Sequence, residues 1–226
     1  MSTPIGNRKD ITLRALEVLS EVDILLCEDS RKTGRLLKHY EETREMGFRA
    51  RLVSFYEENE EGRIPQVIEW LKEGKKIALV SSAGTPLLSD PGFRLVRECV
   101  KQEIKVLSVP GASALLAGLV VSGLPMNSFM YLGFLPKKSG KREKLLTKAM
   151  EVQKLVPQTI VFYESPFRIV KTLKQMDAIF RSGTEVVIGR ELTKKFEEVL
   201  RGTPVQLIKE WGDKKIKGEL VVMLSF

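Results

Sequence analysis

The sequence has few of the residues that build metal centres. Its 226 residues include only two cysteines and one histidine. Two cysteines cannot make a disulfide framework or a four-ligand zinc site, and a single histidine excludes a multi-histidine centre. Cys27 and Cys99 both stand among apolar residues, so we expect them to be small core residues. We therefore predict a protein without a metal.

Long hydrophobic runs and aromatic residues are also scarce. No apolar run approaches the roughly 20 residues that cross a bilayer. The first residues lack the pattern of a signal peptide, so we expect a cytoplasmic protein with no membrane partner. Aromatic residues make up 7% of the chain and mostly occupy expected core positions. We therefore expect no aromatic platform on which single-stranded RNA could stack.

Positive charge, by contrast, is plentiful. Lysine and arginine number 37 against 29 acidic residues, which gives a net charge of +8. Such a balance fits a polyanionic partner such as nucleic acid, although basic enzymes with small substrates also exist. Hydrophobic residues make up 43% of the chain, which suffices for a core and argues against disorder.

The stretch 80–92 is the most informative one. It follows the hydrophobic run Ile77–Val80, precedes a helix that is expected to open at Phe93, and is rich in Gly, Pro, Ser and Thr. Connections between a strand and a helix usually have about 2–6 residues, so this loop is long. The loop either merely turns a corner or forms a ligand site at a strand's carboxyl end, and its length favours a site.

Strands and helices alternate along the whole chain. Strands are predicted at 23–27, 52–56, 77–80, 105–109, 129–134, 159–163, 185–189 and 217–224. The alternation predicts an α/β protein with a parallel sheet that helices cover on both faces in the first half. We place the domains at 1–112 and 113–226. Because residues 114–122 are apolar nearly all round, that helix should be buried. No strand precedes residues 2–7, so we expect the first strand of the fold to be absent here.

Polar residues follow the buried strand at 23–27. Glu28, Asp29, Ser30 and Arg31 stand at its carboxyl end, where α/β proteins bind ligands. The alternative is that Asp29 or Ser30 caps the next helix beside a solvated salt bridge. The two interpretations are compatible. Similar polar segments, 164–168 and 190–194, end two strands of the second half.

The segment 136–142 holds four cations in seven residues. It is not a P-loop, because Gly133 and Gly140 have the wrong spacing and Arg142 replaces the required hydroxyl. It is either a solvated mobile loop or a contact for a phosphate backbone. No Gly-x-Gly-x-x-Gly follows a strand, which argues against an NAD enzyme.

Short segments in a fixed order then identify a family. They are 2–7, 10–16, 28–31, 83–86, 89–92, 110–114, 122–125, 133–137, 162–166 and 190–194. In these segments the chain resembles the bacterial ribosomal RNA small subunit methyltransferase I family, within the tetrapyrrole methylase superfamily. Two positions depart from the family pattern: Ser82 stands where an aspartate is usual, and Phe167 where histidine is frequent.

The resemblance implies two αβα domains of the tetrapyrrole methylase type with the active-site cleft between them. It implies S-adenosylmethionine as cofactor, 2′-O-methylation of a cytidine of 16S rRNA, and a homodimer. The partner is then small-subunit rRNA or the assembled small subunit. Two alternatives stay open: a superfamily methylase with another acceptor, such as a tetrapyrrole or a protein side chain, and a non-catalytic RNA-binding relative.

The resemblance and the positions at strand ends together predict which residues form the site. The cofactor candidates are Pro4, Ser82, Ala83, Gly84, Thr85, Leu88, Ser113, Ala114, Phe162 and Tyr163. A ribose hydroxyl is weakly acidic, so it needs a base or nearby cations. The catalytic candidates are Glu28, Asp29, Arg31 and Glu191. The substrate-binding candidates are Asn7, Lys137, Lys138, Arg168, Arg190 and Lys194, and salt bridging is the alternative role for the charged ones.

Overall fold

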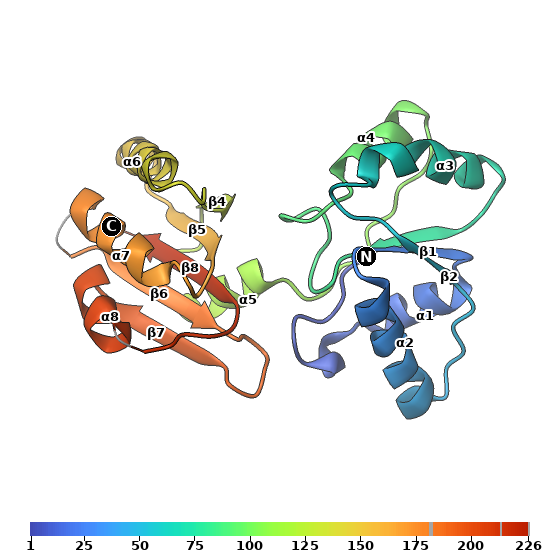
Figure 1. The fold of residues 1–226 in the computed structure, drawn as a ribbon, viewed down its shortest axis with the longest axis horizontal. Helices are drawn as coiled ribbons and strands as arrows, with labels where there is room; N and C mark the ends of the chain where they lie inside the picture. Colours follow the sequence, from blue (N-terminus) through green and yellow to red (C-terminus); the bar gives the residue numbers. More distant parts are fainter. Residues whose placement is uncertain (181–182, 213, 226) are drawn as a thin grey trace. The chain divides into compact units, whose positions relative to one another are not determined.

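The computed structural model describes residues 1–180, 183–212 and 214–225. The chain forms two compact units, Met1–Ser113 and Ala114–Phe226, here called the N-terminal and the C-terminal unit. Each unit has its own sheet and its own core, so each is described by itself (Figure 1). Among the described residues, no helix is long and apolar enough to cross a membrane.

The N-terminal unit is built on three parallel strands. Their order is β2 (Arg51–Ser54), β1 (Ile24–Cys27), β3 (Ile77–Val80). The helices are η1 (Arg8–Asp10), α1 (Leu13–Glu21), α2 (Ser30–Arg44), α3 (Glu60–Lys72) and α4 (Phe93–Lys101). In Figure 1, α1 and α2 lie on one side of the strands, and α3 and α4 lie on the other.

Both faces of this sheet are buried. Successive side chains of a strand point to opposite faces. Accordingly, Leu25 and Cys27 pack in the cluster that includes residues of α1 and α2, whereas Ile24 and Leu26 pack in the cluster with residues of α3 and α4. All four side chains are buried. The predicted parallel sheet with helices on both faces is therefore confirmed for this unit.

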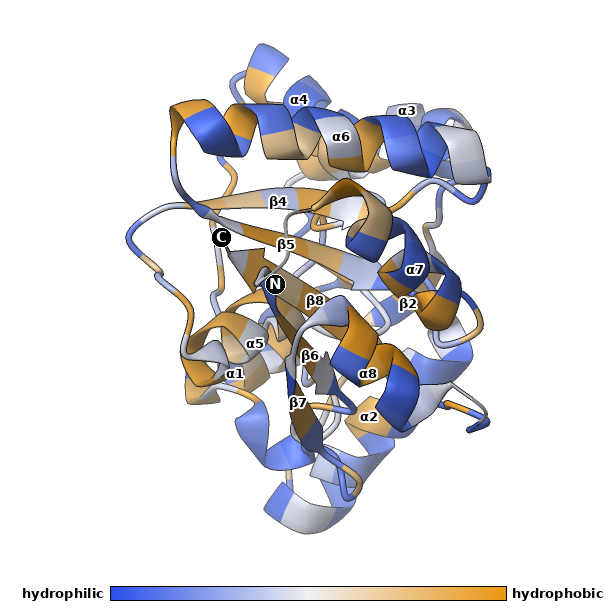
Figure 2. Ribbon diagram, turned by 90° about the vertical axis from the view of Figure 1, so that its left-hand side faces the viewer, coloured by the Kyte–Doolittle hydropathy of each residue, from blue (hydrophilic) through white to orange (hydrophobic). Residues whose placement is uncertain are grey.

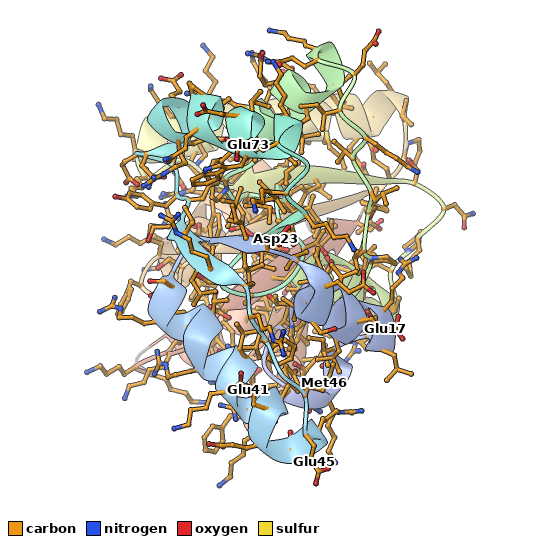
Figure 3. The ribbon with its side chains drawn as sticks, turned by 90° about the vertical axis from the view of Figure 1, so that its right-hand side faces the viewer. Glu17, Asp23, Glu41, Glu45, Met46 and Glu73 are labelled. Carbon is orange, nitrogen blue, oxygen red and sulfur yellow. The ribbon has the colours of Figure 1, made fainter. Side chains whose placement is uncertain are left out.

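Side-chain caps fix where the first helices begin. Thr12 Oγ1 accepts a hydrogen bond from the Ala15 N–H at 3.1 Å, which opens α1. Asp29 caps α2 in the same way. The Asp29 cap thus places the start of α2 directly after the carboxyl end of β1. Asp23 and Glu73, labelled in Figure 3, belong to the opposite, amino-terminal edge of the sheet.

The predicted strand at 105–109 is wrong. These residues form no ladder, and Val106 and Leu107 are 47% and 72% exposed. A hydrophobic run makes a strand only where a neighbouring strand offers its hydrogen bonds, and within the described residues β3 pairs with β1 alone. The segment instead accepts a bond from the start of the chain, because Ser2 N–H donates to Val109 O at 3.1 Å.

The C-terminal unit has a five-stranded mixed sheet. Its order is β4 (Phe129–Phe134), β5 (Thr159–Glu164), β8 (Leu220–Ser225), β6 (Glu185–Arg190), β7 (Glu198–Gly202). Only β4 and β5 are parallel neighbours; the other three pairings are antiparallel. The helices are α5 (Ala114–Ser122), α6 (Ser139–Leu155), α7 (Ile169–Ile179) and α8 (Pro204–Trp211). β7 was not expected from the sequence, and it pairs with β6 as a hairpin.

Three helices cover one face of this sheet. Figure 2 shows α6, α7 and α8 over strands that are mostly hydrophobic. One stripe of α7 faces this core, because Ile169, Leu173 and Met176 are fully buried. Thr203 caps α8 in a capping box with Gln206, and Pro204 stands in the first turn.

Helix α5 lies against the opposite face. An added Cβ at Gly118 would stand 2.7 Å from Val221 Cγ1, so the glycine permits the close approach of the helix to β8. The expectation that α5 is buried all round is wrong, because Leu116 and Val120 are 50% and 65% exposed. A single helix packed on a sheet buries only the side that faces the sheet.

Candidate active site

An open pocket of about 370 Å³ lies at the carboxyl ends of the N-terminal unit's strands. It is lined by Glu28, Asp29, Ser30, Arg31, Lys32, Ser54, Tyr56 and Ser82. These residues follow β1, β2 and β3 or lie at their ends. This is the position at which open α/β sheets bind ligands.

Glu28 joins the end of β1 to the loop that follows β3. Its Oε2 accepts a hydrogen bond from the Ser82 N–H at 3.0 Å. The two residues are 54 positions apart in sequence, and the parallel pairing of β1 with β3 brings them together. The backbone of Ser82 therefore holds Glu28 at the pocket wall.

Asp29 serves as a helix cap. Its Oδ1 accepts from the N–H groups of Arg31 at 2.9 Å and Lys32 at 3.3 Å. Although desolvation acts in the opposite direction, these N–H groups and the Arg31 charge hold the pKa of Asp29 below its usual value. The Arg31 guanidinium is 87% exposed and only 3.5 Å from Asp29. The capping interpretation is confirmed, and the same carboxylate lines the pocket.

The loop 81–92 holds an unusual backbone. Leu87 and Ser89 have φ values of 72° and 66°, a region that residues other than glycine rarely adopt. Side chains keep the loop in place: Ser81 Oγ donates to Gly84 O at 3.3 Å, and Thr85 Oγ1 donates to Ala112 O at 3.0 Å. Such strain persists only where the surroundings fix it, and it gathers at functional sites.

Glu60, which the sequence analysis missed, fixes the end of this loop. It is 6% exposed, and its Oε1 accepts from the N–H groups of Gly92 at 3.1 Å and Arg94 at 3.2 Å. Gly92 has a φ of 125°, and an added Cβ would stand 2.9 Å from Leu87 Cδ1 and clash with Leu79. A buried carboxylate and a glycine at positive φ together fix where the loop meets α4.

Asp90 is a second missed residue. Burial and the nearby charge of Glu28 raise its pKa to about 6, although a hydrogen bond with Ser81 acts in the other direction. The signal was present in the sequence, because Glu28 and Asp90 follow two strands that prove to be neighbours. Burial and a neighbouring negative charge each disfavour the ionised form of a carboxyl and so raise its pKa.

The start of the chain lies beside the same loop. Thr3 forms an isolated antiparallel bridge with Gly84, and Ser2 Oγ lies 2.9 Å from Thr85 Oγ1. The candidates Pro4 and Gly84 are buried, Leu88 is half-buried and Ala83 is exposed. Segments 2–4, 83–85 and 112–113 thus meet in one unit.

Ser113 carries a buried hydroxyl without a partner. It is 8% exposed, and within the described part of the chain its Oγ makes no hydrogen bond. Buried polar atoms in proteins are nearly always satisfied, so such an orphan marks a place where a ligand can supply the partner. Ser113 therefore fits a role in holding a bound group.

In the C-terminal unit the two aromatic candidates face opposite ways. Phe162 is fully buried in the core beneath α6, α7 and α8, so only its backbone could reach a ligand. The ring of Tyr163 is partly exposed and lies 5.4 Å from that of Tyr131 and 5.3 Å from that of Phe134. A register shift between Tyr131 and Phe134, at Gly133, lets both rings meet Tyr163.

Arg168, expected to contact substrate, is held inside its own unit. Its Nη2 lies 2.6 Å from Glu164 Oε1, and the Glu164 side chain is fully buried. Glu164 also accepts from the Thr172 hydroxyl at 2.7 Å and from the Ser165 N–H. This is the salt-bridging alternative, although the bridge lies within one unit rather than across a cleft.

Glu191, Arg190 and Lys194 form similar pairs. Lys194 Nζ lies 2.8 Å from both Glu191 and Glu219, and Arg190 Nε lies 2.8 Å from Glu198. Partial burial opposes ionisation of Glu191, but hydrogen bonds from Lys194 and the Glu219 N–H, with the charges of Lys194 and Arg190, lower its pKa. Burial likewise opposes the charged Lys194, but Glu191 and Glu219 raise its pKa. Glu191 therefore stays ionised, which makes it a weak base.

The remaining substrate candidates lie at the surface. Asn7 Oδ1 accepts from the Lys9 N–H at 3.0 Å, and Lys137 and Lys138 are exposed. The expectation of a solvated mobile loop at 136–142 is wrong from Ser139 on, where α6 begins. Arg142 is 4% exposed and donates to Gln175 and to the Pro136 and Lys137 carbonyls, so it is no free cation.

Comparison with known proteins agrees with this fold. The family model described as "Tetrapyrrole (Corrin/Porphyrin) Methylases" matches residues 2–207. Among solved structures, a uroporphyrin-III-C-methyltransferase from Thermus thermophilus superposes with a TM-score of 0.64 at 18% identity, over 98% of this chain and 91% of that one. A cobalt precorrin-4 methyltransferase gives a TM-score of 0.68 at 16% identity, over 100% and 92%. These likenesses establish the fold.

Closer relatives share one name. A ribosomal RNA small subunit methyltransferase I of Thermotoga maritima is 44% identical over 225 residues, which cover 100% of this chain and 96% of the relative. The protein of the same name from Escherichia coli O157:H7 is 43% identical over 227 residues, or 99% of this chain and 75% of the relative. The chain therefore belongs to the ribosomal RNA small subunit methyltransferase I family of the tetrapyrrole methylases.

Proposed function

We propose that the protein transfers a methyl group from S-adenosylmethionine to the 2′-hydroxyl of a cytidine in small-subunit rRNA, either free or in the assembled subunit. We also propose that it works in the cytoplasm as a homodimer. One observation carries the proposal: the chain matches relatives named ribosomal RNA small subunit methyltransferase I from end to end, at 44% identity over 225 residues for the Thermotoga protein.

The N-terminal unit supplies residues that fit the cofactor. When bound, S-adenosylmethionine carries its methyl group on a sulfonium, from which an oxygen nucleophile can take it. The unsatisfied Ser113 hydroxyl, the strained loop around Gly84 and the buried Pro4 would hold the nucleoside part. Backbone groups and apolar walls of this kind bind adenosyl groups without a Gly-x-Gly-x-x-Gly motif.

The strand-end carboxylates would manage the proton of the ribose hydroxyl. Asp29, a helix cap, and Glu191, paired with Lys194, both have a lowered pKa, whereas the pKa of Asp90 is raised to about 6. A base is most effective when its pKa lies near the working pH. Glu28 lines the pocket and lies close enough to Asp90 to raise its pKa, so we assign proton acceptance to Glu28, with Asp90 as its neighbour, and phosphate contact to the exposed Arg31.

The direct test is methyl transfer in vitro. Small subunits that lack the modification would be incubated with the protein and S-adenosylmethionine labelled in its methyl group. We expect label in the rRNA, at a linkage that resists alkaline cleavage because its 2′-oxygen is methylated. Label in a protein or a tetrapyrrole, with none in rRNA, would replace this proposal by the other-acceptor alternative. Light scattering of the purified protein alone measures its mass and so tests the dimer.

Variants of Asp29 distinguish a role in catalysis from a role in cofactor binding. We expect Asp29→Ala to cut methylation while S-adenosylmethionine affinity, measured by calorimetry, stays within about threefold, a difference below about 1 kcal/mol. Asp29→Asn keeps the helix cap and removes the charge, so it shows whether the charge itself matters. Loss of cofactor binding in Asp29→Asn would move this residue to the cofactor site.

A further inference from the structure

One edge of the C-terminal sheet collects the ends of several strands. β4 is parallel to β5, and β8 is antiparallel to both β5 and β6. β4, β5 and β6 therefore run in the same direction, and their carboxyl ends share an edge. The segments that follow them, 135–138, 165–168 and 191–197, all emerge there. β8 begins at this edge too, and the carbonyl of Lys217, three residues before it, accepts from Arg190 Nη1 at 3.2 Å.

Three phenylalanines at this edge are exposed. Phe167 is 83%, Phe196 65% and Phe134 59% exposed. Phenylalanine is normally among the most buried residue types, so three exposed rings on one edge are unusual. Lys195 Nζ stands 5.6 Å from the centre of the Phe196 ring. The expectation that the aromatic residues lie mostly in the core is wrong here, because these three end strands or stand in the loops that follow them.

The charge of the same edge is positive. Its acids are each engaged: Glu164 by Arg168, Glu191 and Glu219 by Lys194, and Glu198 by Arg190, while Glu197 accepts from the Thr193 N–H. Four exposed lysines remain that form no ion pair within the described residues: Lys137, Lys138, Lys195 and Lys217. With Arg168, Arg190 and Lys194 these lysines make seven cations, which outnumber the five acids, so the edge keeps a net positive charge between its exposed rings.

We infer that this edge binds a single-stranded segment of RNA, with bases stacked on Phe167 and Phe196 and phosphates held by the lysines. Cations that alternate with aromatic rings are the arrangement by which proteins bind single strands without reading their sequence. β5 and β6 are separated only by β8, so their ends lie about 10 Å apart, the length of roughly three stacked nucleotides. The inference deepens the proposed function, because it rests on RNA being the substrate.

The test measures binding of a fluorescein-labelled, single-stranded oligoribonucleotide by anisotropy. We expect Phe167→Ala and Phe196→Ala each to weaken binding about fivefold or more, the loss of one base-stacking contact. Phe167→Trp should keep the affinity, since it keeps a flat ring. The matched control is Phe93→Ala in the N-terminal unit, because Phe93 is 62% exposed and also lies beside a cation, Arg97, at 5.7 Å. That control should bind like the wild type.

Salt dependence tests the lysines. The triple variant Lys137→Gln, Lys138→Gln, Lys195→Gln should lower the slope of log affinity against log salt by about 2, since each phosphate contact on a single strand contributes about 0.7. Changing the exposed Lys72, Lys75 and Lys76 of the other unit to Gln should leave the slope nearly unchanged. Calorimetry with S-adenosylmethionine confirms that every variant is folded.

Two results would overturn the inference. One is unchanged RNA affinity in both phenylalanine variants; the other is a loss confined to self-association in size-exclusion chromatography, which would make the edge a protein contact. The methylation assay keeps this inference apart from the proposed function. If the wild type methylates rRNA and the variants bind RNA normally, the edge assignment fails alone. If the wild type methylates no rRNA but the variants lose RNA binding, the edge stands and the proposed function fails.

Discussion

The strand ends of the two units use their carboxylates differently. In the N-terminal unit, Glu28 and Asp29 accept hydrogen bonds from backbone N–H groups, and the cation beside Asp29, Arg31, is 87% exposed and 3.5 Å away. In the C-terminal unit, Glu164 and Glu191 are bound to arginine or lysine at 2.6 Å and 2.8 Å. In sequence the two sets look alike, since each is a short polar segment after a buried strand.

The difference separates a ligand-facing site from a structural one. A carboxylate bound to N–H groups keeps its full negative charge, and at the pocket this charge is available to a ligand. An ion pair cancels its own charge, and a buried one is costly to break. We therefore expect the acids of the N-terminal unit to matter for activity and those of the C-terminal unit for stability. The predictions that follow test this contrast.

The largest effect should come from Glu164→Ala. It leaves the Arg168 charge and the Thr172 hydroxyl without their partner, and removing one member of a buried pair costs about 3–5 kcal/mol. Urea unfolding would be followed by the fluorescence of Trp211, with Trp70 replaced by Phe so that only the C-terminal unit reports. The exposed Glu151→Ala is the control. A loss of unfolding free energy below about 1 kcal/mol would show that this acid does not stabilise the C-terminal unit, and would contradict the contrast between the two units.

Gly92→Ala should be next. The new Cβ would meet Leu79 and Leu87 at a φ of 125°, so we expect a loss of about 2–4 kcal/mol together with weaker cofactor binding. Gly74→Ala is matched to it, because Gly74 has a φ of 82° but open space around it. That control should cost only about 1 kcal/mol of backbone strain and leave cofactor binding intact. Equal costs in urea unfolding would show that packing around the loop is unimportant.

Asp29→Ala should cost about 1 kcal/mol through loss of the α2 cap. Asp29→Asn caps equally well, so its unfolding free energy should stay near that of the wild type. Thermal unfolding of the two variants gives the comparison. If the Asp29→Asn variant is as unstable as Asp29→Ala, the charge of Asp29 rather than its capping hydrogen bonds stabilises the helix. Asp29 would then resemble the ion-paired acids of the C-terminal unit.

The smallest effect concerns pH. The pKa of Asp90 rises from 3.8 to about 6 on folding, so the folded state favours the protonated form. The contribution of this group to stability is complete below pH 3.8 and is lost as pH rises through about 6. Asp90→Asn, which cannot ionise, should therefore be more stable than the wild type at pH 7, by about 1 kcal/mol or less after solvent screening. The difference should vanish near pH 4. Unfolding midpoints across this range measure it, and a constant difference would contradict the shift.

Local signals in the sequence predicted much of the fold. The unbroken hydrophobic run at 24–27 predicts a buried strand, and Thr12, Asp29 and Thr203 mark the helix starts. Pairing partners are not local, so the segment 105–109 looks like a strand and is none, while Glu198–Gly202 becomes a strand only because β6 lies beside it.

The candidate site was harder to predict because burial and charge pairing depend on distant residues. Residues 162 and 163 look equivalent in sequence, yet the register of β5 sends one ring into the core and the other to the surface. Arg142 reads as a free cation until Gln175 is placed beside it. Glu60 gave no signal, since its partners are backbone N–H groups more than 30 positions away.

The contact between the start of the chain and the central loop also has a consequence for synthesis. Thr3 pairs with Gly84, and Ser2 bonds to Val109. A ribosome makes residues 2 and 3 before their partners, so these residues must wait until some hundred further residues have emerged before they can take their places. Contacts between segments so distant in sequence form slowly, because a long loop must close first. The last part of the N-terminal unit to become ordered in a newly made molecule should thus be the region around Thr85.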